Sequence, residues 1–383
     1  METAGKGVSV NKEALVQVAE EVRRATGLPV GWRDVERTLG ALRATRDLWE
    51  AVRLSRVPLR FLVPIWEGLA RRGLLRVEEG LDLLAEVPAP RPGEAACPAC
   101  EGRGLVGERL PGRAAERFLA WAKERPEAIQ DFDQGYVTPE STLARVALAW
   151  NWGDLEGKEV LVLGDDDLTG LAAALTGLPK RVVVLDADPR IVRFLERAAK
   201  AEGLPLEAHV HDLREPLPEA WVHAFHTFFT DPVEGPLGLQ AFVGRGLLAL
   251  EGEGCAGYVG LTHVEASLAK WADFQRFLLE NGAVITELRD GFHVYENWGY
   301  IEQMRAWPWL PVKRRPEKPW YTSALIRLEL LRRADLENAR VEGDLQDAAA
   351  PTYSALWAAR ARKLSHPRVW MAWVTTTSIS WPR

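Results

Sequence analysis

Apolar residues in the first 85 positions recur at the spacing of helices. In the segment 11–27 the apolar positions lie three or four residues apart, and they are Leu15, Val18, Ala19 and Val22. The same pattern predicts two helices at about 32–42 and 47–54, then a helix ending at Gly73 and two short strands around 78–80. Helices followed by a β-hairpin are the outline of a winged helix. We therefore expect a small winged-helix-like domain over residues 1–95.

From residue 154 onward, short apolar runs alternate with amphipathic stretches. The runs predict strands at 158–163, 181–185, 206–210, 224–229, 257–261, 283–288 and 322–330. The stretches predict helices at 168–178, 189–203, 237–250 and 267–281. This alternation is typical of a doubly wound parallel sheet, so we expect an α/β, Rossmann-like domain of methyltransferase type over residues 136–343. Ligands of such sheets lie beyond the carboxyl ends of the strands.

Length and composition narrow the class of protein. The 383 residues exceed one ordinary core, and 47% hydrophobic with 27% charged residues is a globular balance. The sequence has no apolar run of the roughly 18 to 20 residues that span a bilayer, and we expect neither a membrane nor a secretory signal. Three Cys cannot build a disulfide framework, which favours a reducing, cytoplasmic location. The 38 Arg against 10 Lys, with few Asn and Gln, predict a thermophilic source.

The charge distribution argues against nucleic acid as a partner. The net charge is −6, whereas proteins that coat nucleic acid depend on Lys and Arg contacts with phosphates. Residues 1–95 carry 15 basic and 14 acidic side chains, and a domain that reads DNA normally has a basic face. A dimerisation or lid domain is therefore favoured over a DNA-binding winged helix.

A pair of cysteines lies in the connector that we expect at residues 96–135. Cys97 and Cys100 have the spacing of half a zinc knuckle. A structural zinc needs four ligands, and the third cysteine, Cys255, is far along the chain. A site shared across a dimer, a disulfide and a vestigial pair all stay open, and we predict no metal.

Acidic residues lie at the carboxyl ends of the predicted strands, which is the edge at which such sheets bind nucleosides. Asp186 ends the second strand, where an acid bonds the ribose hydroxyls, and Asp188 is its alternative. Asp212 follows the third strand and is placed to contact an adenine amine. Two acids in register with the sheet predict a nucleoside ligand, with Gly164 of the first loop beside it.

The first loop of the sheet limits which nucleoside can bind. Residues 164–167 are Gly-Asp-Asp-Asp, whereas a dinucleotide needs glycine-rich backbone against its pyrophosphate. Three carboxylates would repel a phosphate, and they also disfavour the carboxylate of ordinary S-adenosylmethionine. One aspartate could cap the following helix, but a single cap does not explain three. We expect a ligand that is cationic at this position.

More acids converge on the same edge of the predicted sheet. Asp133 and Gln134 precede the sheet, and Asp231 and Glu234 follow its fourth strand. Together with the acids of the first loop they predict an anionic cleft, and clefts of one sign concentrate ions of the other. The expected partner is an organic polycation.

These motifs resemble those of the branched-chain polyamine synthases, aminopropyltransferases of thermophilic bacteria and archaea. The resemblance covers about residues 10–335 and rests on the Gly-Asp-Asp-Asp loop, the Phe-Asp-Gln-Gly at 132–135, the Asp-Pro after the fourth strand and the winged-helix-like domain. It implies transfer of aminopropyl groups from decarboxylated S-adenosylmethionine to the internal nitrogen of spermidine, with methylthioadenosine as by-product. It also implies a homodimer. By match to the motif, Asp167 is the candidate base, and Asp165 and Asp166 bind cationic groups or shape the loop.

Two other classes of function stay as alternatives. A ligand-responsive transcription regulator would want a basic recognition helix, which the near-neutral N-terminal region does not favour. A methyltransferase using ordinary S-adenosylmethionine conflicts with the acidic loop. Residues 344–383 are basic and rich in Trp, show no resemblance to the family, and are expected to be a separate C-terminal tail.

Overall fold

The chain forms two compact units. The computed structural model describes residues 12–85, 104, 105, 107–304, 306–343 and 345. Unit 1 comprises Met1–Pro98, Thr262–Ser267 and Asn297–Thr322, and unit 2 comprises Ala99–Leu261, Leu268–Glu296 and Ser323–Arg383. Two short stretches from the second half of the chain thus belong with the N-terminal helices, whereas the sequence placed them in the sheet domain. Cys97, Cys100 and the predicted tail, apart from Leu345, lie outside the described residues.

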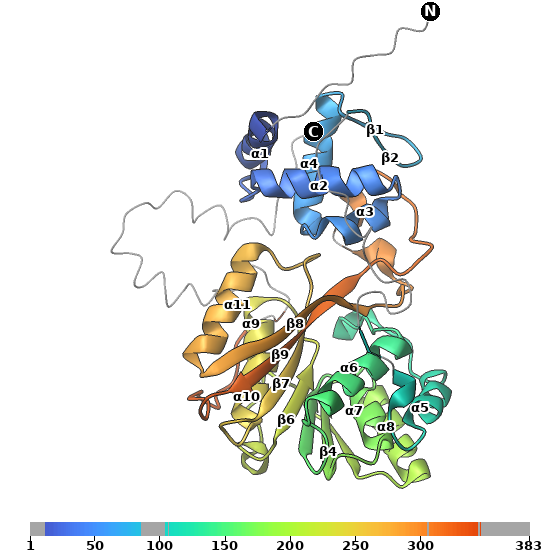
Figure 1. Cartoon of the computed structure of the whole chain (residues 1–383), viewed down its shortest axis with the longest axis vertical. Helices are drawn as coiled ribbons and strands as arrows, with labels where there is room; N and C mark the ends of the chain where they lie inside the picture. Colours follow the sequence, from blue (N-terminus) through green and yellow to red (C-terminus); the bar gives the residue numbers. More distant parts are fainter. Residues whose placement is uncertain (1–11, 86–103, 106, 305, 344, 346–383) are drawn as a thin grey trace, which may run out of the picture. The chain divides into compact units, whose positions relative to one another are not determined.

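Unit 1 is built from four helices and a hairpin (Figure 1). The helices are α1 (Lys12–Thr26), α2 (Trp32–Ala44), α3 (Leu48–Ser55) and α4 (Leu59–Arg71), and the antiparallel strands are β1 (Leu75–Val77) and β2 (Leu81–Leu83). These elements agree with the expected ranges, because each helix has an apolar face, and Asp47 caps α3 by accepting a hydrogen bond of 2.9 Å from the backbone N–H of Glu50. The identification of this unit as a winged helix stays a prediction.

The later stretches complete the core of unit 1. Trp320 and Val264 are buried in the same cluster as Trp49, and the rings of Trp49 and Trp320 lie 4.3 Å apart. The backbone N–H of Leu59 donates to the carbonyl of Val264 at 2.9 Å. Large aromatic rings need many apolar neighbours, so residues that looked like part of the sheet domain are bound into the helical unit.

Unit 2 contains a seven-stranded sheet with the order β5-β4-β3-β6-β7-β9-β8 (Figure 1). The strands are β3 (Glu159–Leu163), β4 (Arg181–Asp186), β5 (Leu206–Val210), β6 (Thr227–Thr230), β7 (Ala256–Leu261), β8 (Ala283–Val294) and β9 (Thr322–Leu330). The five neighbouring strands β5, β4, β3, β6 and β7 are parallel to one another. Strand β9 pairs antiparallel with β7. The doubly wound α/β prediction is confirmed. Strand β9 is antiparallel, whereas an all-parallel sheet was predicted. A parallel strand requires a crossover connection, usually an α-helix, and the segment between β8 and β9 contains no α-helix in its described residues.

Helices cover both faces of this sheet (Figure 1). One face carries α5 (Ala114–Ala122), α6 (Pro139–Asn151), α7 (Thr169–Leu175) and α8 (Pro189–Glu202). The other carries α9 (Pro236–Leu239), α10 (Arg245–Ala249) and α11 (Leu268–Glu280), with a π-helical turn, Gln240–Gly244, inside the single helix predicted at 237–250. Burial on both faces explains why the central strands are almost continuous apolar runs.

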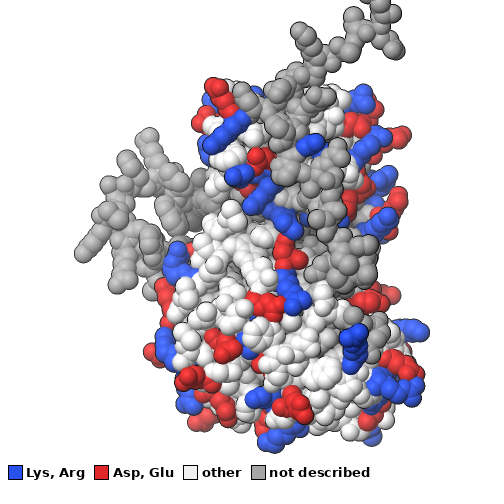
Figure 2. All heavy atoms as spheres, viewed as in Figure 1, with Lys and Arg blue, Asp and Glu red and all other residues white. Residues whose placement is uncertain are grey.

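Charged side chains of both signs are interspersed over the visible face of the molecule (Figure 2). The acids of the first loop do not form a surface patch, because Asp165 and Asp167 are buried. Among the described residues, no helix is long and apolar enough to cross a membrane.

Candidate active site

The loop between β3 and α7 binds its own helix. Asp165 is fully buried, and its carboxylate accepts hydrogen bonds from the backbone N–H groups of Thr169, at 2.5 Å, and Gly170, at 3.0 Å. Gly170 permits this approach, because a Cβ there would lie 2.9 Å from the Asp165 carboxylate. Gly164 has a φ of 69°, and a Cβ there would lie 3.0 Å from the Phe242 ring. Leu168 occupies the N-cap position of α7, and Asp165 binds the first N–H groups of the helix from three residues upstream. The first aspartate of the motif therefore has the capping role that the sequence allowed for one of the three.

The acids at the ends of β3 and β4 crowd together. The backbone N–H of Asp165 donates to Asp186 at 2.7 Å, and the N–H of Asp188 donates to the other oxygen of Asp186 at 2.7 Å. Burial raises the pKa of Asp165 well above its ordinary value, and the charges of Asp167 and Asp186 add to the effect. Burial also raises the pKa of Asp186. The ionised forms of these acids are thus disfavoured in the folded chain, and a nearby cation would favour them.

Gln134 joins the upstream motif to the end of β4. Its side-chain amide donates to Asp188 at 2.9 Å, and Arg190 pairs with the same carboxylate at 2.6 Å. Asp188 also caps α8 through the backbone N–H of Arg190 at 2.8 Å. The structure therefore brings Gln134 to the strand end that the sequence assigned to the ribose.

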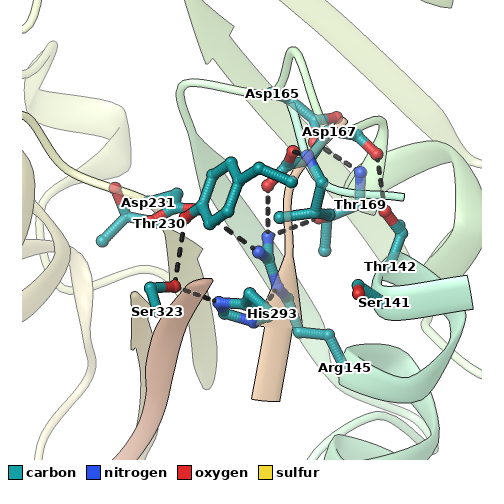
Figure 3. A network of polar contacts seen from close by, with 12 residues as sticks. Ser141, Thr142, Arg145, Asp165, Asp167, Thr169, Thr230, Asp231, His293 and Ser323 are labelled. Atoms are coloured by element: carbon teal, nitrogen blue, oxygen red, sulfur yellow. Dashed lines mark hydrogen bonds and ion pairs between the residues drawn. The ribbon is translucent and has the colours of Figure 1, made fainter. Parts of the chain in front are cut away.

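A buried arginine on α6 stands at the centre of the acids (Figure 3). Arg145 is 3% exposed, and its Nη1 lies 2.9 Å from Asp167 Oδ2 while its Nη2 lies 3.5 Å from Asp231 Oδ2. Burial alone would lower the pKa of Arg145, but the two carboxylates more than offset it and raise the pKa. The other oxygen of Asp167 accepts a hydrogen bond of 2.7 Å from the backbone N–H of Val137. Asp167 is thus held on both sides.

Asp231, just beyond β6, has a different environment. It accepts a hydrogen bond from the hydroxyl of Tyr295, and an ideal Cβ at Gly260 would lie only 2.0 Å from its Oδ1. Burial, with the charge of Asp167, raises the pKa of Asp231 to about 6, although Arg145 and Tyr295 act in the opposite direction. The glycine on β7 therefore makes the room in which this carboxylate sits.

Asp166 is the loop acid that is partly exposed. Among the described residues its carboxylate has neither a hydrogen bond nor an ion pair, and burial with Asp167, Asp186 and Asp231 raises its pKa well above the ordinary value. The charge of Arg125 acts against this increase. Arg125 itself lies over the Tyr136 ring, 3.3 Å from its centroid, and pairs with Glu296 at 3.1 Å. Asp166 is consequently the acid most available to a ligand.

Three further predicted site residues, Asp133, Asp212 and Glu234, are not among the residues labelled in Figure 3. Asp133 is exposed and has a φ of 53°. Asp212 forms an ion pair with Arg214 at 2.6 Å. Glu234 lines a small cavity beside α11. Their assignment to substrate or nucleoside binding stays a prediction.

The sequence analysis missed the residues that hold the acids in place. Arg145, His293 and Ser323 come from α6, β8 and β9, and the network of Figure 3 joins them. One feature of the sequence could have indicated Arg145, since it is a charged residue at the centre of an apolar helix. A buried arginine almost always has a charged partner, so this position predicts a nearby carboxylate. His293 lies beyond the range expected for its strand, and nothing in its local pattern marked it.

No group of three or more His, Cys, Asp or Glu side chains that could hold a metal ion occurs within the described part of the chain. The acidic side chains at the sheet edge outnumber the three arginines near them, which are Arg125, Arg145 and Arg190. An organic cation is the ligand that this arrangement suits.

The strand order and the helices define a Rossmann-like domain of methyltransferase type, and acidic side chains gather at the carboxyl ends of its strands. The sequence profile described as "Branched-chain polyamine synthase A C-terminal domain" matches residues 113–352. The chain belongs to the branched-chain polyamine synthase family.

Curated relatives agree with this assignment. The chain is 99% identical over 341 residues to the N(4)-bis(aminopropyl)spermidine synthase of Thermus thermophilus, covering 89% of this chain and 99% of that protein. It is 43% identical over 325 residues to the protein of the same name from Thermococcus kodakarensis, covering 82% and 92%. The source organisms support the thermophilic origin that the composition predicts.

Similar solved structures include a putative RNA methyltransferase from Pyrococcus horikoshii. That chain has a TM-score of 0.41 and 16% sequence identity, and the match covers 57% of this chain and 96% of that one.

Proposed function

We propose that this chain transfers aminopropyl groups from decarboxylated S-adenosylmethionine to the internal nitrogen of spermidine, forming branched polyamines and methylthioadenosine. The observation that carries the proposal is the set of crowded acids at the ends of β3, β4 and β6, with pKa values raised by burial and mutual repulsion. A polycation relieves that repulsion. The names of the curated relatives support the same activity.

The helix cap supports a donor without a carboxylate or phosphate. In dinucleotide sites the first N–H groups of the helix after the first strand bind the ligand's phosphates. Here the N–H groups of Thr169 and Gly170 already donate to Asp165. An anionic ligand group would find these donors taken and a carboxylate in its place, whereas the sulfonium and ammonium of the decarboxylated donor meet opposite charge.

The reaction is a nucleophilic displacement. The nitrogen of the acceptor forms a bond to the propyl carbon while the bond from that carbon to sulfur breaks, and the sulfonium leaves as a neutral thioether without a general acid. The acceptor amine has a pKa of roughly 10, as a lysine does, so it must lose its proton before it attacks. A carboxylate within reach of this nitrogen would accept that proton. Holding two cations side by side provides much of the remaining acceleration.

Asp167 is the base predicted from the motif, but the geometry favours a second candidate in the same loop. Both oxygens of Asp167 are engaged, one by Arg145 and one by the Val137 N–H. Asp166 is partly exposed and is engaged by no described residue. We therefore infer that Asp166 receives the acceptor's proton and that Asp167 holds the loop, with Asp231 binding a cationic group.

Mass spectrometry of the products tests the function. The purified chain, incubated with decarboxylated S-adenosylmethionine and spermidine, should add one and then two aminopropyl groups and release methylthioadenosine. Spermidine recovered without a mass gain would refute the proposal.

Two aspartate variants distinguish the bases. If Asp166 is the base, Asp166→Asn should lower kcat by roughly 100-fold or more, as loss of a general base does, and Asp167→Asn should act mainly on stability. The matched control is Asp335→Asn, which removes an exposed acid that follows β9. A large loss of kcat in Asp167→Asn with an unchanged melting temperature would restore Asp167 as the base.

We also infer that the chain acts as a cytoplasmic homodimer. The family resemblance supports the dimer and the few cysteines support the compartment. A monomer mass measured by sedimentation equilibrium at micromolar concentration would refute the homodimer.

A further inference from the structure

Five side chains form a closed ring of polar contacts that includes Asp231, and Figure 3 labels four of them, Arg145, Asp231, His293 and Ser323. Arg145 Nε donates to His293 Nε2 at 3.0 Å, and His293 Nδ1 lies 2.8 Å from Ser323 Oγ. Ser323 Oγ lies 3.0 Å from the Tyr295 hydroxyl, and Tyr295 donates to Asp231 Oδ2. The ion pair of Arg145 Nη2 with the same Asp231 oxygen, at 3.5 Å, completes the ring.

The direction of each hydrogen bond follows from the arginine. A guanidinium N–H only donates, so His293 Nε2 must accept, and a neutral imidazole then carries its proton on Nδ1. Nδ1 donates to Ser323, whose single hydroxyl proton is therefore available to the Tyr295 oxygen. The Tyr295 proton in turn points to Asp231. Each side chain in the ring thus donates to the next one, and the last donor, Tyr295, donates to Asp231 Oδ2.

We propose that His293 and Ser323 are positioning residues. Because Arg145 can only donate, the hydrogen bonds through His293 and Ser323 orient the Tyr295 hydroxyl so that it donates to Asp231, and this keeps Asp231 an ionised acceptor for the polyamine. The proposal rests on the proposed function in one respect, namely that Asp231 meets a cationic substrate. His293 is fully buried and Ser323 is 2% exposed, so neither is placed to touch substrate. They act through Tyr295.

The groups around Asp231 explain why such a relay is needed. Burial and the charge of Asp167 both favour the protonated form of Asp231, and Asp166 adds to the negative potential there. Arg145 and the Tyr295 hydroxyl favour the ionised form. Arg145 is 3.5 Å away, so the hydroxyl is the closer support. A hydroxyl free to rotate would give that support only part of the time.

Ser323→Ala breaks the relay at one oxygen and leaves Arg145, Tyr295 and Asp231 in place. It removes the hydroxyl that donates to the Tyr295 oxygen, so the Tyr295 hydroxyl becomes a weaker donor to Asp231. It also removes the Ser323 acceptor of the buried His293 Nδ1–H, which should lower the stability. The matched control is Thr227→Val, which removes another buried hydroxyl of the same sheet, one that donates to the Asp154 carbonyl at 2.7 Å. Ser323→Thr restores the hydroxyl and is the conservative rescue.

The measurements are kcat/KM for spermidine from pH 5.5 to 9 and the unfolding free energy over the same range. In Ser323→Ala the acidic limb of the kcat/KM profile should move to higher pH. The decrease should be about 5-fold at pH 6 and less than about 2-fold at pH 8.5, since weakening a hydrogen bond to a charged group shifts its titration by up to roughly one unit. KM for the donor should hardly change, and Ser323→Thr should recover the profile.

Two outcomes overturn the relay. One is a wild-type pH profile in Ser323→Ala, and the other is an equal profile shift in Thr227→Val, which would make the effect one of general stability. If the wild-type chain makes no product at all, the proposed function fails, but the relay is still tested without substrate. Ser323→Ala should then lose more stability than wild type as the pH rises from 5.5 to 8, and an equal loss overturns it.

Discussion

Replacing Asp231 by asparagine should make the protein relatively more stable as the pH rises. The pKa of this carboxyl is raised from 3.8 to about 6 by burial and by Asp167, and its side chain is 19% exposed. The folded chain therefore binds this proton more tightly than the unfolded chain does. The associated stability is complete below pH 3.8 and is lost as the pH rises through 6. A difference of about two units corresponds to about 3 kcal/mol.

Asp231→Asn cannot ionise and escapes that loss. Urea unfolding at pH 4, 5, 6, 7 and 8 should show the free energy of unfolding of the variant, relative to wild type, increasing by up to about 3 kcal/mol between pH 4 and pH 7. Any constant effect of the amide cancels in this comparison. Asp212→Asn is the matched control, because the pKa of Asp212 is lowered from 3.8 by its hydrogen bond with Arg214. Its carboxyl is then ionised in both the folded and the unfolded chain over most of this pH range, so the curve of this control should be nearly flat. A flat or falling curve for Asp231→Asn would refute the reasoning about the crowded acids.

Three further substitutions test other parts of the site. Arg145→Met leaves the buried carboxylate of Asp167 and the partly exposed one of Asp231 without their cation and should destabilise the protein by about 3 kcal/mol in urea unfolding; a loss below about 1 kcal/mol would contradict its role. Gly260→Ala should displace Asp231 and lower kcat by about 10-fold or more, whereas the control Gly299→Ala, with nothing within 4 Å of its Cβ, should not. Asp165→Ala should cost about 1–2 kcal/mol, because the N–H groups of Thr169 and Gly170 lose their acceptor, and Asp165→Asn, which retains one oxygen, should partly restore the stability.

The sheet could be predicted because each strand carries its own pattern. The β3 run is apolar at every buried position and is followed by the Gly-Asp-Asp-Asp turn, so a window of a few residues was sufficient. The same is true of the four N-terminal helices. The division into units could not be predicted this way, because Trp320 and Val264 join the helical unit through contacts far apart along the chain.

The acids of the site were predicted and their counter-ions were not. Asp165, Asp186 and Asp231 each follow a strand, where the fold itself predicts ligand contacts. Arg145 meets Asp231 only after the sheet has formed, and His293 and Ser323 meet only through the pairing of late strands. Periodicity describes one element at a time and does not indicate which residues become neighbours.

The three acids of the first loop, which the sequence does not distinguish, have different surroundings in the structure. Of the three loop acids, Asp165 caps a helix, Asp167 pairs with Arg145, and Asp166 is available to a ligand. The net charge of −6 is a poor guide to this arrangement, since charges of both signs are interspersed on the visible surface. The buried position of the acids is what favours a polycation.

The central claim is that the acidic loop selects a donor without a carboxylate. The most direct test compares kcat/KM for decarboxylated S-adenosylmethionine with that for ordinary S-adenosylmethionine, spermidine being the acceptor in both assays. A carboxylate forced beside buried like charges should cost several kcal/mol, so we predict a preference of at least about 1000-fold for the decarboxylated donor and aminopropylated products alone. Comparable use of the two donors, or a methylated polyamine, would contradict the account.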